Sequence, residues 1–404
     1  RPLSAGAGEP PVDEAPPPAV LIVGGELLTP APAGRGDVLL VHGRVARVGA
    51  VDRGALDRLG LAYAVVDAAD AWVAPGLIDA HEHLLGGSGE GGLSLQSPML
   101  NLREIVRAGI TTVVGVLGVD TTMKTMAGLL GHVKGLAEEG ITTRMWSGGY
   151  NVPPTTVMGS IREDMLFLDP VIGAGEIAVS DERGLNQSAQ ELAKLVRDTH
   201  VGGLLTGKAG VTHFHVGEEE TRLQPLRDLI DGHGVKPEWL YPTHVQRNAR
   251  LLDEAIELAR AGATVDFDTA AEDLPRWYAY YRDRGGPLDR LTASSDADSN
   301  APDTLARELC RLVRHHGVAP SDALRLVTEN VARVLKLGRK GRLAEGMDGD
   351  VVVLDRDTFA VRHVAAMGRV VVADGAPVVR ERFLAESKRD WHLRGDKAAQ
   401  APED

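Results

Sequence analysis

The distribution of apolar residues divides the chain into a central region with one rhythm and two ends with another. In the centre, short β-branched runs alternate with amphipathic stretches of about 10 to 20 residues, as in repeated βα units. The pattern predicts strands at residues 77–83, 111–118, 142–149, 175–181, 211–217, 240–245, 263–268 and 291–296. Strands that alternate with helices in this way predict an α/β fold, a TIM-like (β/α)8 barrel whose active site lies at the C-terminal ends of the strands.

The two ends of the chain have shorter alternating runs, broken by Gly and Asp, which favour strands and hairpins. We predict that residues 19–73 and 345–380 together form a small β-sandwich domain beside a barrel at residues 74–344. Residues 1–18 are rich in Pro and poor in large apolar side chains, which predicts a disordered arm. Residues 381–404 form a C-terminal tail in this prediction.

Composition and charge narrow the possible functions. A hydrophobic fraction of 43% and a charged fraction of 25% are typical of soluble globular proteins. The net charge of -13 argues against a nucleic-acid partner, because phosphate binding needs a basic surface. No apolar stretch approaches the roughly 20 residues that cross a bilayer, so we predict no membrane partner and a cytoplasmic location. Cys310 is the only cysteine, which excludes an intrachain disulfide and a thiolate-rich metal site.

Potential metal ligands recur where the predicted strands end. His81 and His83 close the first strand, and side chains two residues apart on a strand point to the same side. An HxH pair alone is a weak signal, since most such pairs are ordinary surface or core histidines. Further donors stand near the ends of other strands: His215 on the fifth, His244 on the sixth and Asp296 on the eighth.

Glu176 is the least ordinary of these positions. It opens the predicted fourth strand and leads the apolar run IAV, where an unpaired buried charge would cost several kcal/mol. A carboxylate between two cations is strongly stabilised instead. Four imidazoles and two carboxylates at one barrel mouth therefore predict two divalent metal ions, such as Zn²⁺.

Several motifs, in this order, resemble one protein family. The stretches PGLIDAHEHLLGGSGEGG, SGGYNVP, VGGLLTGKAGVTHFHVG, PTHVQRN and SSD are similar to those of the amidohydrolase superfamily. Within that superfamily they most resemble the bacterial isoaspartyl dipeptidases, which are metal-dependent β-aspartyl dipeptidases. The resemblance covers roughly residues 20–380, so it implies the same barrel, the same metal chemistry and the same class of substrate.

The resemblance also implies how the ligands are shared. It assigns His81, His83 and Asp296 to one ion, His215 and His244 to the other, and Glu176 to a bridge between them. This chain departs from the family at the bridge, where the family usually has a lysine carbamylated by carbon dioxide. Because Glu176 carries its own carboxylate, we predict that the metal site assembles without carbon dioxide.

The chemistry implied by the resemblance is hydrolysis of an amide bond by a hydroxide that bridges the two ions. Asp296 would accept the proton of the hydroxide and pass it to the leaving amine, which is general acid–base catalysis. Tyr150 in SGGYNVP matches the tyrosine that donates a hydrogen bond to the developing oxyanion.

The substrate would be a small zwitterion, a β-aspartyl dipeptide with two carboxylates and one free amine. Arg183 and Arg247 follow the fourth and sixth strands and suit carboxylates, because a guanidinium can bind a carboxylate through two hydrogen bonds. Glu90, in the Gly-rich loop after the HxH pair, suits the α-ammonium group. Ser88 and Asn300 complete the predicted substrate-binding residues.

Besides Glu176, three residues differ from the subgroup pattern. Val119 stands in place of a threonine that contacts substrate, and Asn300 in place of a serine. Both changes bear on which leaving residue is preferred. His213 forms a second HxH pair with His215 where the family has an apolar residue, and we interpret it as supporting the site or the fold rather than as a ligand.

Two alternative functions remain open on the sequence. The same metal chemistry serves amidohydrolases that act on cyclic amides or on N-acyl amino acids. A non-catalytic scaffold is a second alternative, although scaffolds typically lose ligands and all six positions here hold competent donors. Relatives commonly assemble into homo-oligomers, so we also expect a homo-oligomer.

Overall fold

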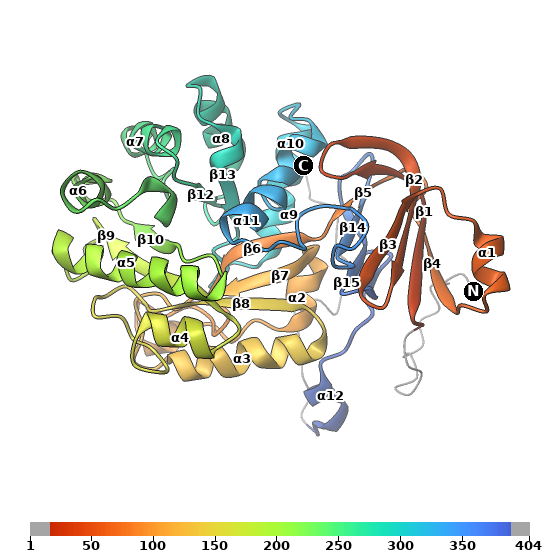
Figure 1. Cartoon of the computed structure of the whole chain (residues 1–404), viewed down its shortest axis with the longest axis horizontal. Helices are drawn as coiled ribbons and strands as arrows, with labels where there is room; N and C mark the ends of the chain where they lie inside the picture. Colours follow the sequence, from red (N-terminus) through yellow and green to blue (C-terminus); the bar gives the residue numbers. More distant parts are fainter. Residues whose placement is uncertain (1–16, 389–404) are drawn as a thin grey trace.

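The structure is a computed structural model that describes residues 17–388 (Figure 1). The predicted disordered arm at residues 1–18 therefore lies almost wholly outside the described residues, and so does the tail beyond residue 388. The described part of that tail contains a short helix, α12 (Arg382–Glu386). Within residues 17–388, no helix combines the length and the apolar character needed to span a bilayer.

The central region forms the predicted barrel, and every predicted strand is present. The strands are β6 (Leu77–Glu82), β7 (Ile110–Gly115), β8 (Thr142–Ser147), β9 (Val171–Val179), β10 (Thr212–Val216), β11 (Leu240–Thr243), β12 (Val265–Asp268) and β13 (Leu291–Ser294). The first six form one curled parallel sheet in chain order, and β12 and β13 form a parallel pair. An isolated bridge between Glu82 and Ala297 brings the segment after β13 back to β6, so the strand ends surround one mouth.

The fourth strand begins earlier than the sequence predicts. β9 starts at Val171 rather than at residue 175, so Glu176 is inside the strand and does not open it. Gly173 looks like a strand breaker in the sequence, but here it makes room for a neighbour. A Cβ at Gly173 would lie 2.3 Å from the Val211 carbonyl oxygen and 2.8 Å from the Trp146 ring.

A β-bulge places Glu176 within this strand. Thr212 of β10 pairs with Ala174, but Phe214 pairs with Ile177, so Gly175 and Glu176 together face the single residue His213. An extra residue in one strand interrupts the alternation of its side chains and re-aims them, a device common beside active sites.

The helices cover the outside of the barrel (Figure 1). They are α2 (Leu102–Arg107), α3 (Met126–Glu139), α4 (Ile161–Phe167), α5 (Ala189–Thr206), α6 (Gln224–His233), α7 (Ala249–Arg260), α8 (Leu274–Asp283), α9 (Asp303–Arg314), α10 (Pro320–Arg325) and α11 (Glu329–Val334), with single 3-10 turns at Leu93–Leu95, Pro237–Trp239 and Leu288–Arg290. Local sequence explains their ends: Ser188 and Glu191 form a capping box at the start of α5, and Gly207 ends it in the left-handed conformation.

Both ends of the chain build a second sheet of nine strands. These are β1 (Ala19–Leu28), β2 (Pro32–Val41), β3 (Arg44–Gly49), β4 (Tyr63–Asp67), β5 (Ala71–Pro75), β14 (Val351–Asp355), β15 (Val361–Ala366), β16 (Arg369–Ala373) and β17 (Ala376–Pro377). Strand β5 pairs antiparallel with β14, for example Val73 with Val353, and this pair joins the two ends. Alternate residues such as Val20 and Ile22 form the core inside the sheet, while α1 (Arg53–Arg58) places Leu56 against its other face.

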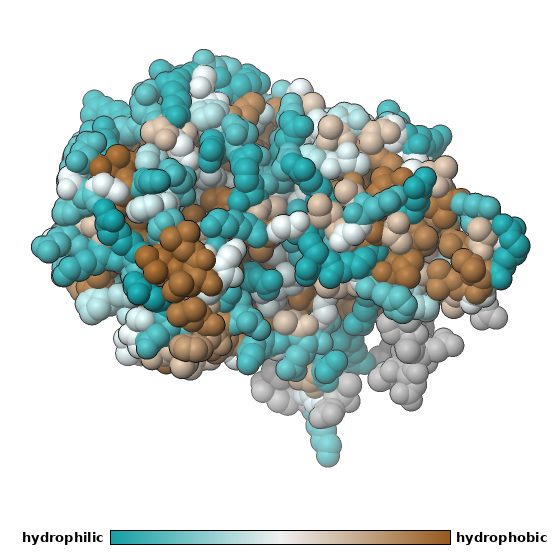
Figure 2. All heavy atoms as spheres, viewed as in Figure 1, coloured by the Kyte–Doolittle hydropathy of each residue, from teal (hydrophilic) through white to brown (hydrophobic). Residues whose placement is uncertain are grey.

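The surface is largely hydrophilic, with an apolar patch on the barrel side. Phe167 at the end of α4 is 68% exposed, and Leu204 and Leu205 near the end of α5 are 66% and 61% exposed. Figure 2 shows a hydrophobic area over this part of the molecule. The homo-oligomer expected from the sequence stays a prediction.

Candidate metal centre and active site

The fold brings all six predicted ligands to the barrel mouth. His81 is in β6, Glu176 in β9 and His215 in β10, whereas His83, His244 and Asp296 lie just beyond the ends of β6, β11 and β13. His244 and Asp296 both have positive φ angles, 62° and 50°. Non-glycine residues adopt this left-handed conformation rarely, and such residues cluster at functional sites.

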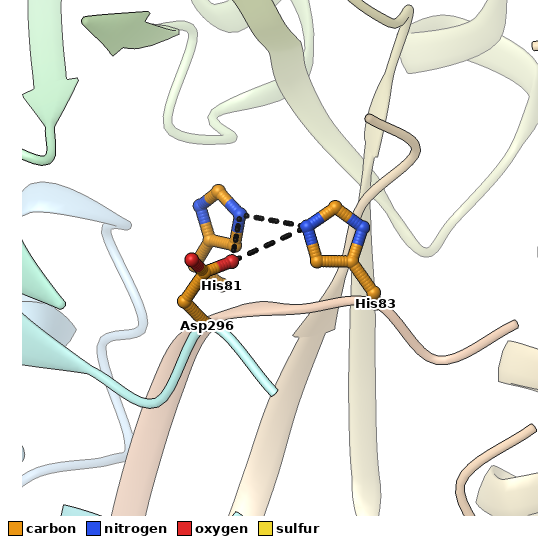
Figure 3. Close-up of side chains that lie close together, drawn as sticks. All are labelled: His81, His83 and Asp296. Carbon is orange, nitrogen blue, oxygen red and sulfur yellow. Dashed lines mark hydrogen bonds and ion pairs between the residues drawn. The ribbon is translucent and has the colours of Figure 1, made fainter. Parts of the chain in front are cut away.

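Three of the ligands form a compact group (Figure 3). Asp296 Oδ1 lies 3.3 Å from Nε2 of His81 and 3.3 Å from Nε2 of His83. The two Nε2 atoms are 3.4 Å apart. All three ligand atoms lie within 4.8 Å of one another, a spacing suited to one ion with bonds of about 2.0–2.2 Å.

Glu176 lies at the centre of the candidate ligands. Its Oε2 lies 3.0 Å from His215 Nδ1, 3.7 Å from His81 Nε2 and 3.8 Å from His244 Nε2, and its Oε1 lies 3.6 Å from His83 Nε2. The side chain is only 1% exposed. One buried carboxylate therefore faces four imidazoles.

The buried carboxylates of the site favour positive charge on the groups around them. Burial lowers the pKa of His81, but the carboxylates of Glu176 and Asp296 outweigh burial and raise it to about 9. The pKa of His244 is likewise raised to about 10, against burial, by Asp268 and Asp296. Divalent cations can supply the positive charge that protons would otherwise supply, and the donor set of imidazoles and carboxylates suits such ions. The residues present therefore fit the predicted metal.

Asp268 is a functional candidate that the sequence did not single out. Its Oδ2 lies 2.8 Å from His244 Nδ1 and accepts a hydrogen bond of 2.7 Å from Gln246 Nε2. With His244 and Asp296 it also forms another group of close ligand atoms. The signal was available, because Asp268 ends the seventh predicted strand just as the other ligands end theirs.

Asp181 is the second residue that the sequence analysis missed. Its Oδ2 lies 2.9 Å from His215 Nε2, which leaves His215 Nδ1 facing Glu176. The same carboxylate accepts two hydrogen bonds from Arg183, at 2.8 and 2.7 Å. Against the effect of burial, these bonds hold the pKa of Asp181 well below its usual range.

His213 contacts the candidate ligand His81 on the side away from the other candidate ligands. Its Nε2 lies 2.8 Å from His81 Nδ1 and its Nδ1 lies 2.9 Å from the Tyr241 carbonyl oxygen. The ring stacks on Trp146, with centroids 4.9 Å apart. Burial lowers the pKa of His213 well below its ordinary value, so the ring is neutral.

Tyr150 reaches the metal site from the segment after β8. Its hydroxyl lies 3.0 Å from His215 Nδ1, and the side chain is buried. Burial and the nearby Glu176 carboxylate raise the pKa of Tyr150 well above 10, so the hydroxyl keeps its proton and can donate it in a hydrogen bond.

The predicted substrate-binding residues lie in loops around the mouth. Arg183 bonds to Glu90 at 2.9 Å as well as to Asp181, so the structure pairs two of the residues with each other. Arg247 donates from Nε to the Val216 carbonyl at 2.9 Å, and its Nη1 lies 3.8 Å from the Glu218 carboxylate.

The remaining two predicted residues have different surroundings. Ser88 is partly exposed in the loop that follows β6. Asn300 donates from Nδ2 to the Ser295 carbonyl and accepts from the Asp298 backbone N–H, so in this structure it braces the loop after β13.

Comparisons with known proteins agree with this architecture. The model of the Amidohydrolase family matches residues 72–375. The crystal structure of a β-aspartyl dipeptidase from Fervidobacterium islandicum AW-1, in complex with β-Asp-Leu dipeptide, is 32% identical and superposes with a TM-score of 0.85. It covers 90% of this chain and 98% of that one. An enamidase structure, 17% identical over 88% of this chain and 96% of that one with a TM-score of 0.64, shares the fold.

The curated proteins that this chain matches in sequence are named adenine deaminases, not dipeptidases. The adenine deaminase of Halalkalibacterium halodurans is 25% identical over 85% of this chain and 55% of its own length. Adenine deaminase 2 of Rhizobium meliloti is 27% identical over 77% of this chain and 50% of its own length. The chain thus spans about half the length of the curated relatives it matches. The family match over residues 72–375 shows that the chain belongs to the amidohydrolase family of hydrolases.

Proposed function

We propose that this protein hydrolyses β-aspartyl dipeptides at a centre that holds two divalent metal ions, with Zn²⁺ the first candidate. The observation that carries the proposal is the buried Glu176 carboxylate facing four imidazoles, beside a rim of arginine and glutamate side chains. The 32% identity to a β-aspartyl dipeptidase, over nearly the full length of that protein, supports the choice of substrate.

The proposed ligands are Glu176 and the residues around it. His81, His83 and Asp296 would hold one ion, His215 and His244 the other, and Glu176 would lie between them. When bound, such ions would supply a water molecule whose pKa lies far below that of bulk water, at about 7, and they would polarise the substrate carbonyl.

Asp296 is the proposed proton carrier. Burial raises its pKa, but His244 and the hydrogen bonds with His81 and His83 hold that pKa well below its usual range. Asp296 is therefore ionised at neutral pH and can accept a proton from the attacking water at its carboxylate. It then delivers the proton to the leaving amine. Tyr150, protonated and buried beside His215, donates a hydrogen bond to the oxyanion.

Arg247 is the better placed of the two arginines to bind a substrate carboxylate. The guanidinium of Arg183 is already occupied by Asp181 and Glu90. Within residues 17–388, the terminal nitrogens of Arg247 have only a distant carboxylate, Glu218 at 3.8 Å. A bidentate bond to a carboxylate uses those terminal nitrogens. Glu90, whose side chain is 51% exposed, would exchange its bond with Arg183 for the α-ammonium of the substrate. Ser88 and Asn300 would contact the substrate from the loops after β6 and β13.

Hydrolytic deamination of an aminopurine is the second candidate, favoured by the adenine deaminases among the relatives. Both reactions attack a carbon that bears nitrogen, so the metal centre alone does not distinguish them. The rim favours the dipeptide, because the paired arginine and glutamate side chains suit a zwitterion, and adenine is uncharged at neutral pH.

The test is a substrate panel on the metal-free protein reconstituted with Zn²⁺. The panel contains β-Asp-Leu, α-Asp-Leu, adenine, a hydantoin and an N-acetyl amino acid. We expect metal-dependent cleavage of β-Asp-Leu with a kcat/KM at least about 100-fold above that of every other compound. Ammonia release from adenine at a higher kcat/KM would replace the proposal with the deaminase. Two bound ions without turnover of any compound would favour a scaffold.

A further inference from the structure

The hydrogen bonds of His213 decide which of its nitrogens carries a proton. Its Nδ1 lies 2.9 Å from the carbonyl oxygen of Tyr241, and a carbonyl oxygen can only accept. The proton of a neutral His213 is therefore on Nδ1, and Nε2 is left as an acceptor. The ring is fully buried, and no carboxylate bonds to either of its nitrogens among the described residues, so the charged form is disfavoured.

The contact between His213 and His81 in turn determines where His81 carries its proton. His213 Nε2 lies 2.8 Å from His81 Nδ1, so His81 must donate from Nδ1. A neutral His81 then has its lone pair on Nε2. That atom faces Asp296 Oδ1 at 3.3 Å, His83 Nε2 at 3.4 Å and Glu176 Oε2 at 3.7 Å. The backbone carbonyl of Tyr241 thus determines, through His213, which nitrogen of His81 points a lone pair into the site.

We propose that His213 is a positioning residue that holds His81 in the tautomer whose Nε2 can bind a metal ion. It acts through His81 and touches neither ion nor substrate. Stacking on Trp146 and the bond to Tyr241 fix the plane of the His213 ring, so the direction of the hydrogen bond is fixed as well. The inference rests on the metal site of the proposed function but is independent of the substrate.

His244 provides the internal comparison. Its Nδ1 is held by the Asp268 carboxylate at 2.8 Å, not by His213, so its tautomer is set by a separate residue. Loss of His213 should therefore weaken metal binding through His81 and leave binding through His244 and His215 intact. A general loss of packing would weaken both.

The experiment is a metal titration of the metal-free protein with Zn²⁺ against a chromophoric chelator, for the parent, His213→Leu and His213→Gln. Leu removes the acceptor, while the Gln side-chain oxygen can replace Nε2 as acceptor. We expect His213→Leu to weaken one of two ions by about 10- to 100-fold and the other by less than about threefold. His213→Gln should bind both ions within about threefold of the parent.

Controls separate the hydrogen bond from packing. His200→Leu removes another tryptophan-stacked histidine, one that lies on helix α5 and stacks on Trp239, and should bind as the parent does. If His213→Leu does not fold, as judged by circular dichroism, His213→Phe keeps a ring against Trp146 and takes its place. Parent-like binding of both ions by the folded variant overturns the inference, and so does equal weakening of both ions or equal impairment by Leu and Gln. A parent that binds no ion overturns the proposed function instead.

A measurement on the parent protein needs no variant to fold. In Zn²⁺-loaded protein labelled with ¹⁵N-histidine, the inference places protons on Nδ1 of both His81 and His213. Long-range nitrogen–proton NMR correlations distinguish the two tautomers of each ring. A proton on Nε2 of His213 would contradict the inference.

Discussion

The floor and the rim of the mouth are held in different ways. We define the floor as the buried side chains His81, Glu176, His213 and His244, and the rim as Glu90, Arg183 and Arg247. The floor side chains are at most 3% exposed, whereas the rim side chains are 27% to 51% exposed. A buried charge without a partner costs several kcal/mol, so each floor residue is fixed by its neighbours. An exposed ion pair such as Arg183–Glu90 is worth at most about 1 kcal/mol, so a substrate can replace it.

The largest effect should come from removing the Glu176 carboxylate. Glu176→Ala leaves four imidazoles without their shared carboxylate, so we expect fewer than two bound ions and a loss of activity of about 10³-fold or more. Elemental analysis and the β-Asp-Leu assay measure both quantities. Glu182→Ala, an exposed glutamate on the same side of the barrel, is the matched control. Full activity with two ions in Glu176→Ala would refute the role of Glu176.

Tyr150 is the proposed hydrogen-bond donor to the oxyanion. Tyr150→Phe removes only the hydroxyl, so we expect kcat to fall by about 10²-fold while metal content is unchanged. Tyr281→Phe is the control, because it also removes a buried tyrosine hydroxyl, one that donates to the Pro287 carbonyl. An unchanged kcat in Tyr150→Phe would remove Tyr150 from the mechanism.

A rim substitution should change binding more than turnover. Arg247→Lys keeps the charge but loses the paired donors, so we expect KM for β-Asp-Leu to rise by about 10- to 100-fold with kcat within a few fold. Arg250→Lys, exposed on α7, should behave as the parent does. If kcat falls and KM does not change, Arg247 acts in the reaction step rather than in substrate binding.

The floor also predicts how metal affinity depends on pH. In the metal-free protein the pKa values of His81 and His244 are about 9 and about 10, so both imidazoles are protonated at pH 7. Each ion must displace those protons, and its apparent affinity should fall by about tenfold for each proton displaced when pH drops from 8 to 7. Calorimetry in buffers of different ionisation enthalpy counts the protons released. Equal affinity at both pH values would contradict this account.

The last prediction is that carbon dioxide has no effect on metal loading. Because Glu176 carries its own carboxylate, metal loading should proceed equally in carbon-dioxide-free buffer and in bicarbonate. The rate and extent of Zn²⁺ uptake measure this. Faster loading in bicarbonate would point to a carbamylated lysine elsewhere in the site.

The sequence predicts the candidate metal ligands better than the rim, for a physical reason. Strand ends in a parallel barrel converge whatever the loops do, so His81, His83, His215, His244 and Asp296 could be placed together from the strand pattern alone. The predicted start of the fourth strand was wrong, because β9 begins at Val171 and includes Gly173, which packs closely against the Trp146 ring.

The partners of those residues were harder to predict. Asp181 and Asp268 follow strand ends like the ligands, yet only coordinates show that they bond to His215 and His244. The pairing of Glu90 with Arg183 joins two loops that are far apart in the sequence. Alternation and spacing carry no information about the relative position of such loops.

The nine-stranded sheet has a consequence for synthesis on the ribosome. Strand β5 leaves the exit tunnel early, but its partner β14 emerges only after the entire barrel has been translated. Until then β5 presents an open strand edge, which neighbouring nascent chains could pair with. Completion of this sheet is therefore a late event in synthesis, and slow translation of the barrel would lengthen the interval in which the β5 edge is exposed.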